Sequence, residues 1–110
     1  MEVSEKVSLI KSGKLSAVKN IQAFLDKIGK ENKKINAILH INPNAIKEAE
    51  AVDKKIKAGR AGKLAGLAIA VKSNINVKGL IANSASKTLE YYTSTYDARV
   101  IEKIKSEDGI

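Results

Sequence analysis

A single apolar run, residues 67–71, constrains the fold of this chain more than any other feature. Its sequence, Leu-Ala-Ile-Ala-Val, is the longest unbroken apolar stretch among the 110 residues and stands between Gly66 and Lys72. A short, wholly apolar run with such boundaries is typical of a buried strand. Alternation places the three larger side chains on one face of that strand and the two small alanines on the other. Because one strand leaves its edges unpaired, the run predicts a sheet whose other strands lie elsewhere.

The residues before this run have the spacing of amphipathic helices. Apolar side chains recur three and four residues apart, which is the period of one helix face. Ser16 is expected to cap the second helix, and Pro43 to open the third. The spacing predicts three helices, which end at Gly13, Gly29 and Gly59. A short apolar run at 37–41 is a further strand candidate.

The residues after the run predict the start of a crossover connection. Residues 73–96 are rich in Ser, Asn and Thr, so we expect irregular structure there apart from one short helix near 87–91. Asp97 is expected to cap a final helix, which Gly109 ends and Ile110 follows. A helix, a glycine and then a β-branched residue are typical of a connection that begins the next parallel strand. We therefore expect the chain to be a piece of a longer one, or to rely on a partner.

Together these elements predict an α/β fold in which N-terminal helices lead into the first part of a mixed sheet. Residues 1–110 would form a single incomplete domain. Residues 1–63 are expected to be its helical, basic region, and residues 64–110 to form a strand, a loop and a helix.

The positive charge lies in the first half of the chain. The formal net charge is +8, and residues 1–63 hold 14 basic and 7 acidic side chains, a net charge of +7. A positive surface attracts polyanions such as RNA. The lysines are interleaved with Glu and Asp, however, and this pattern favours solvent-exposed helix faces over a nucleic-acid site.

Composition excludes several classes of protein. There is no cysteine, which rules out disulfides, zinc fingers and a thiol nucleophile. The one histidine, His40, excludes a multi-histidine metal site and a Ser-His-Asp triad within the chain. No apolar run is long enough to span a membrane, and the charged N-terminus does not resemble a signal peptide. We expect a cytoplasmic protein with no membrane partner.

Lys72 is the residue most suggestive of chemistry. It follows the apolar run directly, at the carboxyl end of the predicted strand, where open α/β sheets place functional groups. A lysine held in a desolvated site favours its neutral amine, which can act as a general base toward a hydroxyl. A lysine that simply extends into solvent at the edge of the sheet is the alternative, and position alone favours it.

The sequence around Lys72 resembles the amidase signature family. Residues 66–80 read Gly-Leu-Ala-Ile-Ala-Val-Lys-Ser-Asn-Ile-Asn-Val-Lys-Gly-Leu, and the resemblance continues through residues 84–90 and 96–101. It covers nearly the whole chain. Within the family, the chain most resembles the glutamine-hydrolysing component of the tRNA-dependent amidotransferases, of archaeal type.

The resemblance implies a Ser–cis-Ser–Lys triad in which Lys72 is the ultimate base. A bridging serine would relay the proton from a nucleophilic serine, which attacks the carboxamide of glutamine. The released ammonia would pass to the B subunit of the amidotransferase, which amidates Glu-tRNA(Gln) with ATP and Mg²⁺; the C subunit is a further implied partner. The resemblance places no cofactor and no metal in this chain.

The chain departs from the family pattern at three points. Ser73 stands where the family usually has Asp, and Ala68 where it commonly has Pro. Both triad serines are expected beyond residue 110, so Ser84 and Ser86 are given no catalytic role. We therefore expect the chain alone to be inactive. Two alternatives remain open: an amidase of the same family that acts on small amides, and a non-catalytic domain that binds RNA or protein.

Overall fold

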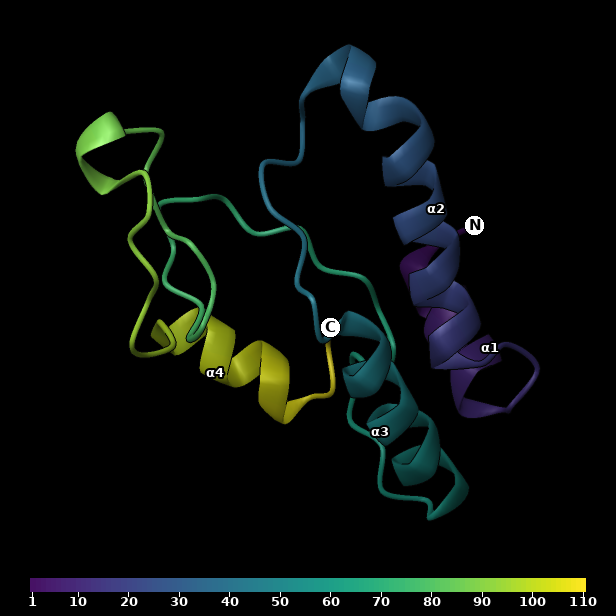
Figure 1. Ribbon diagram of the computed structural model, residues 1–110. Helices are drawn as coiled ribbons and strands as arrows, with labels where there is room; N and C mark the ends of the chain where they lie inside the picture. Colours follow the sequence, from purple (N-terminus) through teal and green to yellow (C-terminus); the bar gives the residue numbers. More distant parts are fainter.

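Four α-helices and one short 3₁₀ turn carry the regular structure of the computed structural model, which describes residues 1–110 (Figure 1). The helices are α1 (Val3–Lys11), α2 (Ala17–Ile35), α3 (Ala45–Lys57) and α4 (Arg99–Ser106), and the turn is η1 (Lys87–Leu89). Figure 1 shows α1, α2 and α3 on one side of the molecule and α4 on the other, with a long irregular arm from α3 to α4 that carries η1. None of the helices combines the length and apolar composition needed to cross a bilayer.

The core lies where the first three helices meet the residues after α3. Its largest fully buried side chain is Ile10 of α1. Small residues fill much of the remainder, and they let α2 and α3 approach each other closely. The buried cluster consists of Ile10, Ala17, Ile21, Ala45, Ala49, Val52 and Ala65. The predicted apolar stripes therefore face the core, but only the first part of the α2 stripe is buried there.

Two acceptors hold the N-terminus of α2. The Ser16 hydroxyl accepts a hydrogen bond from Lys19 N at 3.0 Å, which confirms the predicted cap. The Asp53 carboxylate, on α3, accepts from Ala17 N at 2.7 Å and from Val18 N at 3.2 Å. A carboxylate at this position satisfies two N–H groups that no helical carbonyl reaches, and it complements the helix dipole. Asp53 thereby joins α3 to α2.

The predicted end of the second helix is wrong. The helix continues through Gly29 to Ile35 and ends where Asn36 adopts a left-handed conformation, with φ 49°. A single glycine inside a helix costs only about 1 kcal/mol relative to alanine, so Gly29 alone does not end α2. The residues after Ile35 provide a specific stop for the helix. The Asn32 amide supplies that stop, because it donates to Ile38 O at 2.7 Å and accepts from Ile38 N at 2.8 Å.

Asp97 does not cap the last helix as predicted. Ala98 precedes α4, and no side chain caps that end. The Asp97 carboxylate instead accepts hydrogen bonds from Lys78 N at 2.8 Å and from Lys105 Nζ at 2.9 Å. The hydrogen bond from Lys78 N lowers the pKa of Asp97, and Lys105 adds to this effect, while burial opposes it. Asp97 therefore joins the irregular arm to α4.

The strands predicted at 67–71 and 37–41 are not formed. The bridge that is present, between Ile81 and Thr93, is isolated and antiparallel. Ile110 nevertheless pairs with the run at 67–71, because it donates to Leu67 O at 2.9 Å and its carbonyl accepts from Ile69 N at 2.7 Å. Two such bonds from one residue are the parallel pairing pattern. A run that meets only one residue of a neighbouring segment cannot develop a ladder, so the predicted sheet is reduced to this contact.

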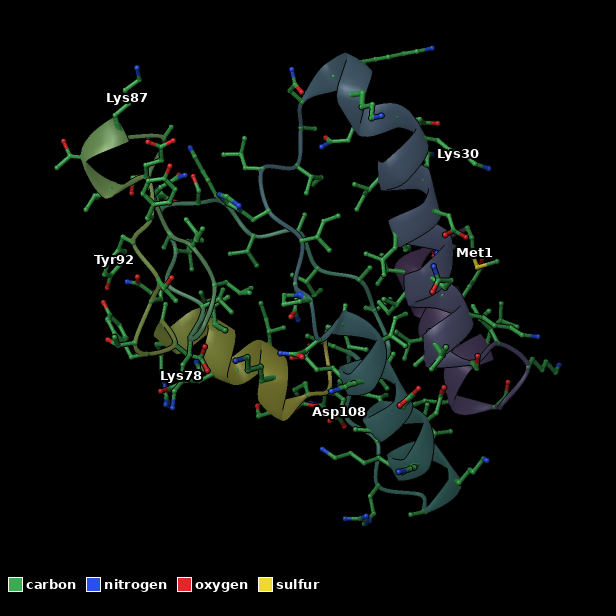
Figure 2. The ribbon with its side chains drawn as sticks, viewed as in Figure 1. Met1, Lys30, Lys78, Lys87, Tyr92 and Asp108 are labelled. Atoms are coloured by element: carbon green, nitrogen blue, oxygen red, sulfur yellow. The ribbon has the colours of Figure 1, made fainter.

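The Asp108 carboxylate fixes Ile110 next to this run. Asp108, labelled in Figure 2, is buried. Its carboxylate accepts from Lys55 Nζ at 2.7 Å and from Gly62 N at 2.8 Å. Its carbonyl accepts from Gly66 N, and the carbonyl of Glu107 accepts from Leu64 N. Burial acts to raise the pKa of Asp108, but the hydrogen bonds from Lys55 and Gly62 outweigh burial and lower that pKa below 3.8.

Gly66 lets the run begin directly against the core. Its φ is +74°, which favours glycine, and a Cβ there would lie 2.8 Å from the Cβ of Ala17. Asn20, buried on α2, donates to Gly66 O at 2.8 Å. The chain therefore leaves the core at one defined point before residues 67–71.

We predict that Asp53→Ala lowers the free energy of unfolding by about 1–3 kcal/mol, because it leaves two helix N–H groups unpaired. Asp53→Asn keeps one acceptor oxygen and should lose less. Urea unfolding followed by circular dichroism measures the loss, and amide hydrogen exchange at Ala17 and Val18 should accelerate in the alanine variant. Unchanged exchange at these two amides would contradict the assignment.

We predict that Asp108→Asn lowers the free energy of unfolding at pH 7 by about 1–3 kcal/mol. Because the folded pKa lies below the ordinary 3.8, the stability that this carboxylate contributes is complete above that pH and is lost as pH falls through the folded pKa. The difference between wild type and variant should therefore shrink below about pH 3.8. The exposed Glu50→Gln is the control, and a difference that does not change with pH would contradict the role of the charge.

Candidate active-site lysine and the groove beside it

Lys72 lies at the rim of an open groove of about 640 Å³. Twenty of the 31 residues that line the groove are hydrophobic. They come from α2, from the segment 37–44, from the start of α3, from residues 68–81 and from the C-terminal part of the chain. The groove is the one place where the predicted catalytic residue meets apolar surface from several elements.

The run before Lys72 has the two faces that the alternation predicts. Leu67 is buried and Ile69 half-buried, whereas Val71 is 38% exposed as the run leaves the core. Ala68 and Ala70 are exposed on the opposite face, where no element of this chain covers them. Lys72 follows on that open face.

The Lys72 side chain is exposed, and its Nζ forms no hydrogen bond or ion pair within the chain. The backbone carbonyl of Lys72 accepts from Ile75 N at 3.0 Å, and this hydrogen bond forms a turn directly after the run. Ser73 is half-buried, and its carbonyl accepts from Ser84 N at 3.1 Å. Residues 72–75 and the arm at 83–86 are thus tied together by backbone, not by the lysine.

The hydroxyls of Ser84 and Ser86 form no hydrogen bond with Lys72. Ser84 and Ala85 both have positive φ values, 50° and 57°, and Asn83 Oδ1 accepts from Ala85 N at 3.0 Å. This is a tight polar turn held by its own asparagine. The expected Ser–Ser–Lys triad is therefore not assembled from residues 1–110, and Lys72 is its one candidate member in this chain.

The other residues considered for binding lie outside any assembled site. His40 is exposed on the groove wall. Tyr91 is 82% exposed, and the Tyr96 hydroxyl accepts from Asn76 Nδ2 at 2.8 Å. Twelve of the 14 basic residues in 1–63 are exposed, as expected for solvated helix faces. No three His, Asp or Glu side chains are grouped closely enough to hold a metal ion.

Comparison with known proteins decides the family. The model of the Amidase family matches residues 19–110. This chain belongs to the amidase family. The resemblance seen around Lys72 is therefore confirmed, and it extends back to the first turn of α2.

Curated relatives narrow the likeness within the family. The chain is 52% identical over its whole length to the A subunit of glutamyl-tRNA(Gln) amidotransferase from Methanothermobacter thermautotrophicus, and 42% identical to that from Methanobrevibacter smithii. The corresponding protein of Clostridium botulinum is 44% identical over 96% of the chain. The chain spans about a quarter of the length of these relatives, 25% for the two archaeal ones and 22% for the bacterial one.

Solved structures confirm an amidase-type fold. Native peptide amidase from Stenotrophomonas maltophilia superposes with a TM-score of 0.94 at 24% identity, covering 100% of this chain and 23% of that one. A chain from a vestigial complex linked to the origins of an s-triazine catabolic enzyme gives 0.93 at 28% identity, with coverages of 100% and 25%. The helices and the irregular arm thus have the arrangement found in one part of a larger amidase fold.

Proposed function

We propose that this chain is the lysine-bearing N-terminal segment of the A subunit of a glutamyl-tRNA(Gln) amidotransferase. In the whole protein, glutamine hydrolysis would supply ammonia for the ATP-dependent amidation of Glu-tRNA(Gln) in translation. The observation that carries the proposal is the match to archaeal A subunits over the whole chain at up to 52% identity. The peptide amidase, by contrast, is only 24% identical.

The proposed chemistry assigns Lys72 the role of a base. Its neutral amine would accept a proton from a bridging serine, which takes one from the nucleophilic serine. The serine oxygen then attacks the carboxamide carbon, and the C–N bond breaks as ammonia leaves with a returned proton. Water hydrolyses the acyl-enzyme to glutamate. Both serines would come from outside residues 1–110.

The fold of the whole protein would provide the environment that this chemistry requires. We propose that residues 67–71 become a strand of a mixed α/β sheet when the remaining amidase fold is present. Lys72 is exposed in this chain, and only a covering element would desolvate its amine. Ser73, beside it, offers a hydroxyl where the family usually has a carboxylate, so hydrogen bonding next to the lysine would differ.

The further partners follow from the same assignment. The B and C subunits of the amidotransferase would assemble with the whole protein in the cytoplasm, and ammonia would pass to the B subunit. ATP and Mg²⁺ would serve the amidation of Glu-tRNA(Gln). We assign both to the B subunit.

Two other functions are distinguishable from this one. An amidase for small amides would hydrolyse its substrate without the B subunit or charged tRNA, and the superposition on peptide amidase is what favours it. A domain that binds RNA would use the exposed basic residues of 1–63, and its affinity would fall steeply with salt. Reversal of several of these lysines would leave RNA binding unchanged if the charges had no such role.

We predict that Lys72→Ala abolishes glutamine hydrolysis in a chimera that joins residues 1–110 to the remaining sequence of the Methanothermobacter relative. Loss of a general base costs about 10²–10⁴-fold in rate. Ammonia release measures the activity, and circular dichroism checks the fold. Lys87→Ala, on the exposed turn η1 (Figure 2), is the matched control and should keep wild-type activity. Wild-type activity in Lys72→Ala would exclude the proposed role.

We predict that residues 1–110 alone release no ammonia from glutamine above the uncatalysed rate, because a base without a nucleophile forms no acyl-enzyme. The same ammonia assay at high protein concentration checks this. Activity that disappears in Lys72→Ala would show that the chain contains a nucleophile of its own.

A further inference from the structure

A turn at residues 83–86 of the irregular arm holds the backbone next to Lys72. Ser84 N donates to Ser73 O at 3.1 Å, and this is the one hydrogen bond that joins residues 72–75 to a distant part of the chain. The Lys72 amine has no partner within the chain, so its side chain is not held in place by the amine. The point at which this side chain leaves the backbone therefore depends on the contact between Ser84 and Ser73.

The turn has a backbone conformation that its own residues disfavour. Ser84 and Ala85 both have positive φ values, 50° and 57°, in the left-handed region that glycine and asparagine occupy most readily. Ser86 N donates to Asn83 O at 2.8 Å, so the turn has the hydrogen bond and the two positive φ values of a type I′ turn. Such turns usually carry Asn-Gly at their two central positions, where this chain has Ser-Ala. The turn therefore needs support from outside its central residues.

The Asn83 side chain gives that support. Its Oδ1 accepts from Ala85 N at 3.0 Å, and an asparagine bonded to the backbone two residues ahead stabilises a turn. The residue before it, Ala82, is buried, and Ala82 N donates to Tyr92 O at 3.0 Å. Asn83 thus connects a fixed part of the arm to the turn whose Ser84 N–H points at Ser73.

We propose that Asn83 is a positioning residue for Lys72. It keeps Ser84 N directed at Ser73 O, and Ser73 is the next residue after the lysine. A displacement of about 1 Å in an active site lowers a rate by about 100-fold, so the loss of this support affects kcat. The inference rests on the proposed function and adds to it a residue that lies outside the Ser–Ser–Lys triad.

The test uses the chimera that joins residues 1–110 to the remaining sequence of the Methanothermobacter relative. Asn83→Ala removes the acceptor, and we expect it to lower kcat for glutamine at least about 10-fold while KM changes less than about 2-fold. Ala85→Gly, added to Asn83→Ala, allows a positive φ without the side chain, and the double variant should recover at least about half of the wild-type kcat.

Asn32→Ala is the matched control. Asn32 also holds a chain reversal through side-chain bonds to the backbone, but at the far end of α2, and it contacts Ile38. This variant should lower the stability of the fold and keep the wild-type kcat. A general loss of stability is thereby separated from a displaced lysine.

A second measurement does not depend on activity. Amide hydrogen exchange of Ser84 in the chimera should accelerate at least about 10-fold in Asn83→Ala and slow again in the double variant. Exchange that Asn83→Ala leaves unchanged would show that this side chain does not hold the turn. Faster exchange together with a wild-type kcat would show that the turn does not position Lys72.

Two further results separate this inference from the proposed function. A loss of activity, or of the fold as seen by circular dichroism, that Ala85→Gly does not restore would overturn the inference, because Asn83 would then act in another way. A wild-type chimera that releases no ammonia would refute the proposed function itself, and with it the reaction that Asn83 would serve.

Discussion

The Asp108 carboxylate joins parts of the chain that are far apart in sequence, and the position of the lysine-bearing run depends on it. Lys55 is 53 residues away and Gly62 is 46, yet both donate to the same side chain. The neighbouring backbone carbonyls hold residues 64 and 66, so the run at 67–71 leaves the core beside Ile110. One buried carboxylate thus sets where the run begins and where the parallel contact forms.

A second carboxylate makes the scaffold behind this contact. Asp53 fixes α3 to the first turn of α2, and small buried residues let the two helices approach closely. The packing uses only the first half of α2, since no residue of that helix after Ile21 is buried. The groove is lined on this side by the middle of α2, from Ile21 to Ile28, and the helix continues beyond it to Ile35. The apolar face of α2 therefore passes from the core at Ile21 into the groove at Phe24 and Ile28.

Local patterns in the sequence predicted the local features correctly. The Ser16 cap, the apolar faces of the helices and the two faces of the run at 67–71 depend on neighbours in sequence, so spacing is enough to find them. Asp53 and Asp108 could not be found in this way, because their partners are tens of residues distant. Asp97 was misassigned for the same reason: its position before a helix suggests a cap, but Lys78 and Lys105 compete for its carboxylate. Position in the run located Lys72, while only the family resemblance suggested its chemistry.

The exposed amine of Lys72 and the open edge beside it have one physical cause. Residues 67–71 pair with Ile110 alone, so nothing covers their alanine face, and the lysine that follows them stays in water. An element that continued the ladder past Ile110 would bring backbone and apolar side chains against the same face. It would exclude water from Nζ and so favour the neutral amine that a base requires. Completion of the sheet would therefore also activate the lysine. Contacts made in the groove would offset the free-energy cost of desolvating its amine.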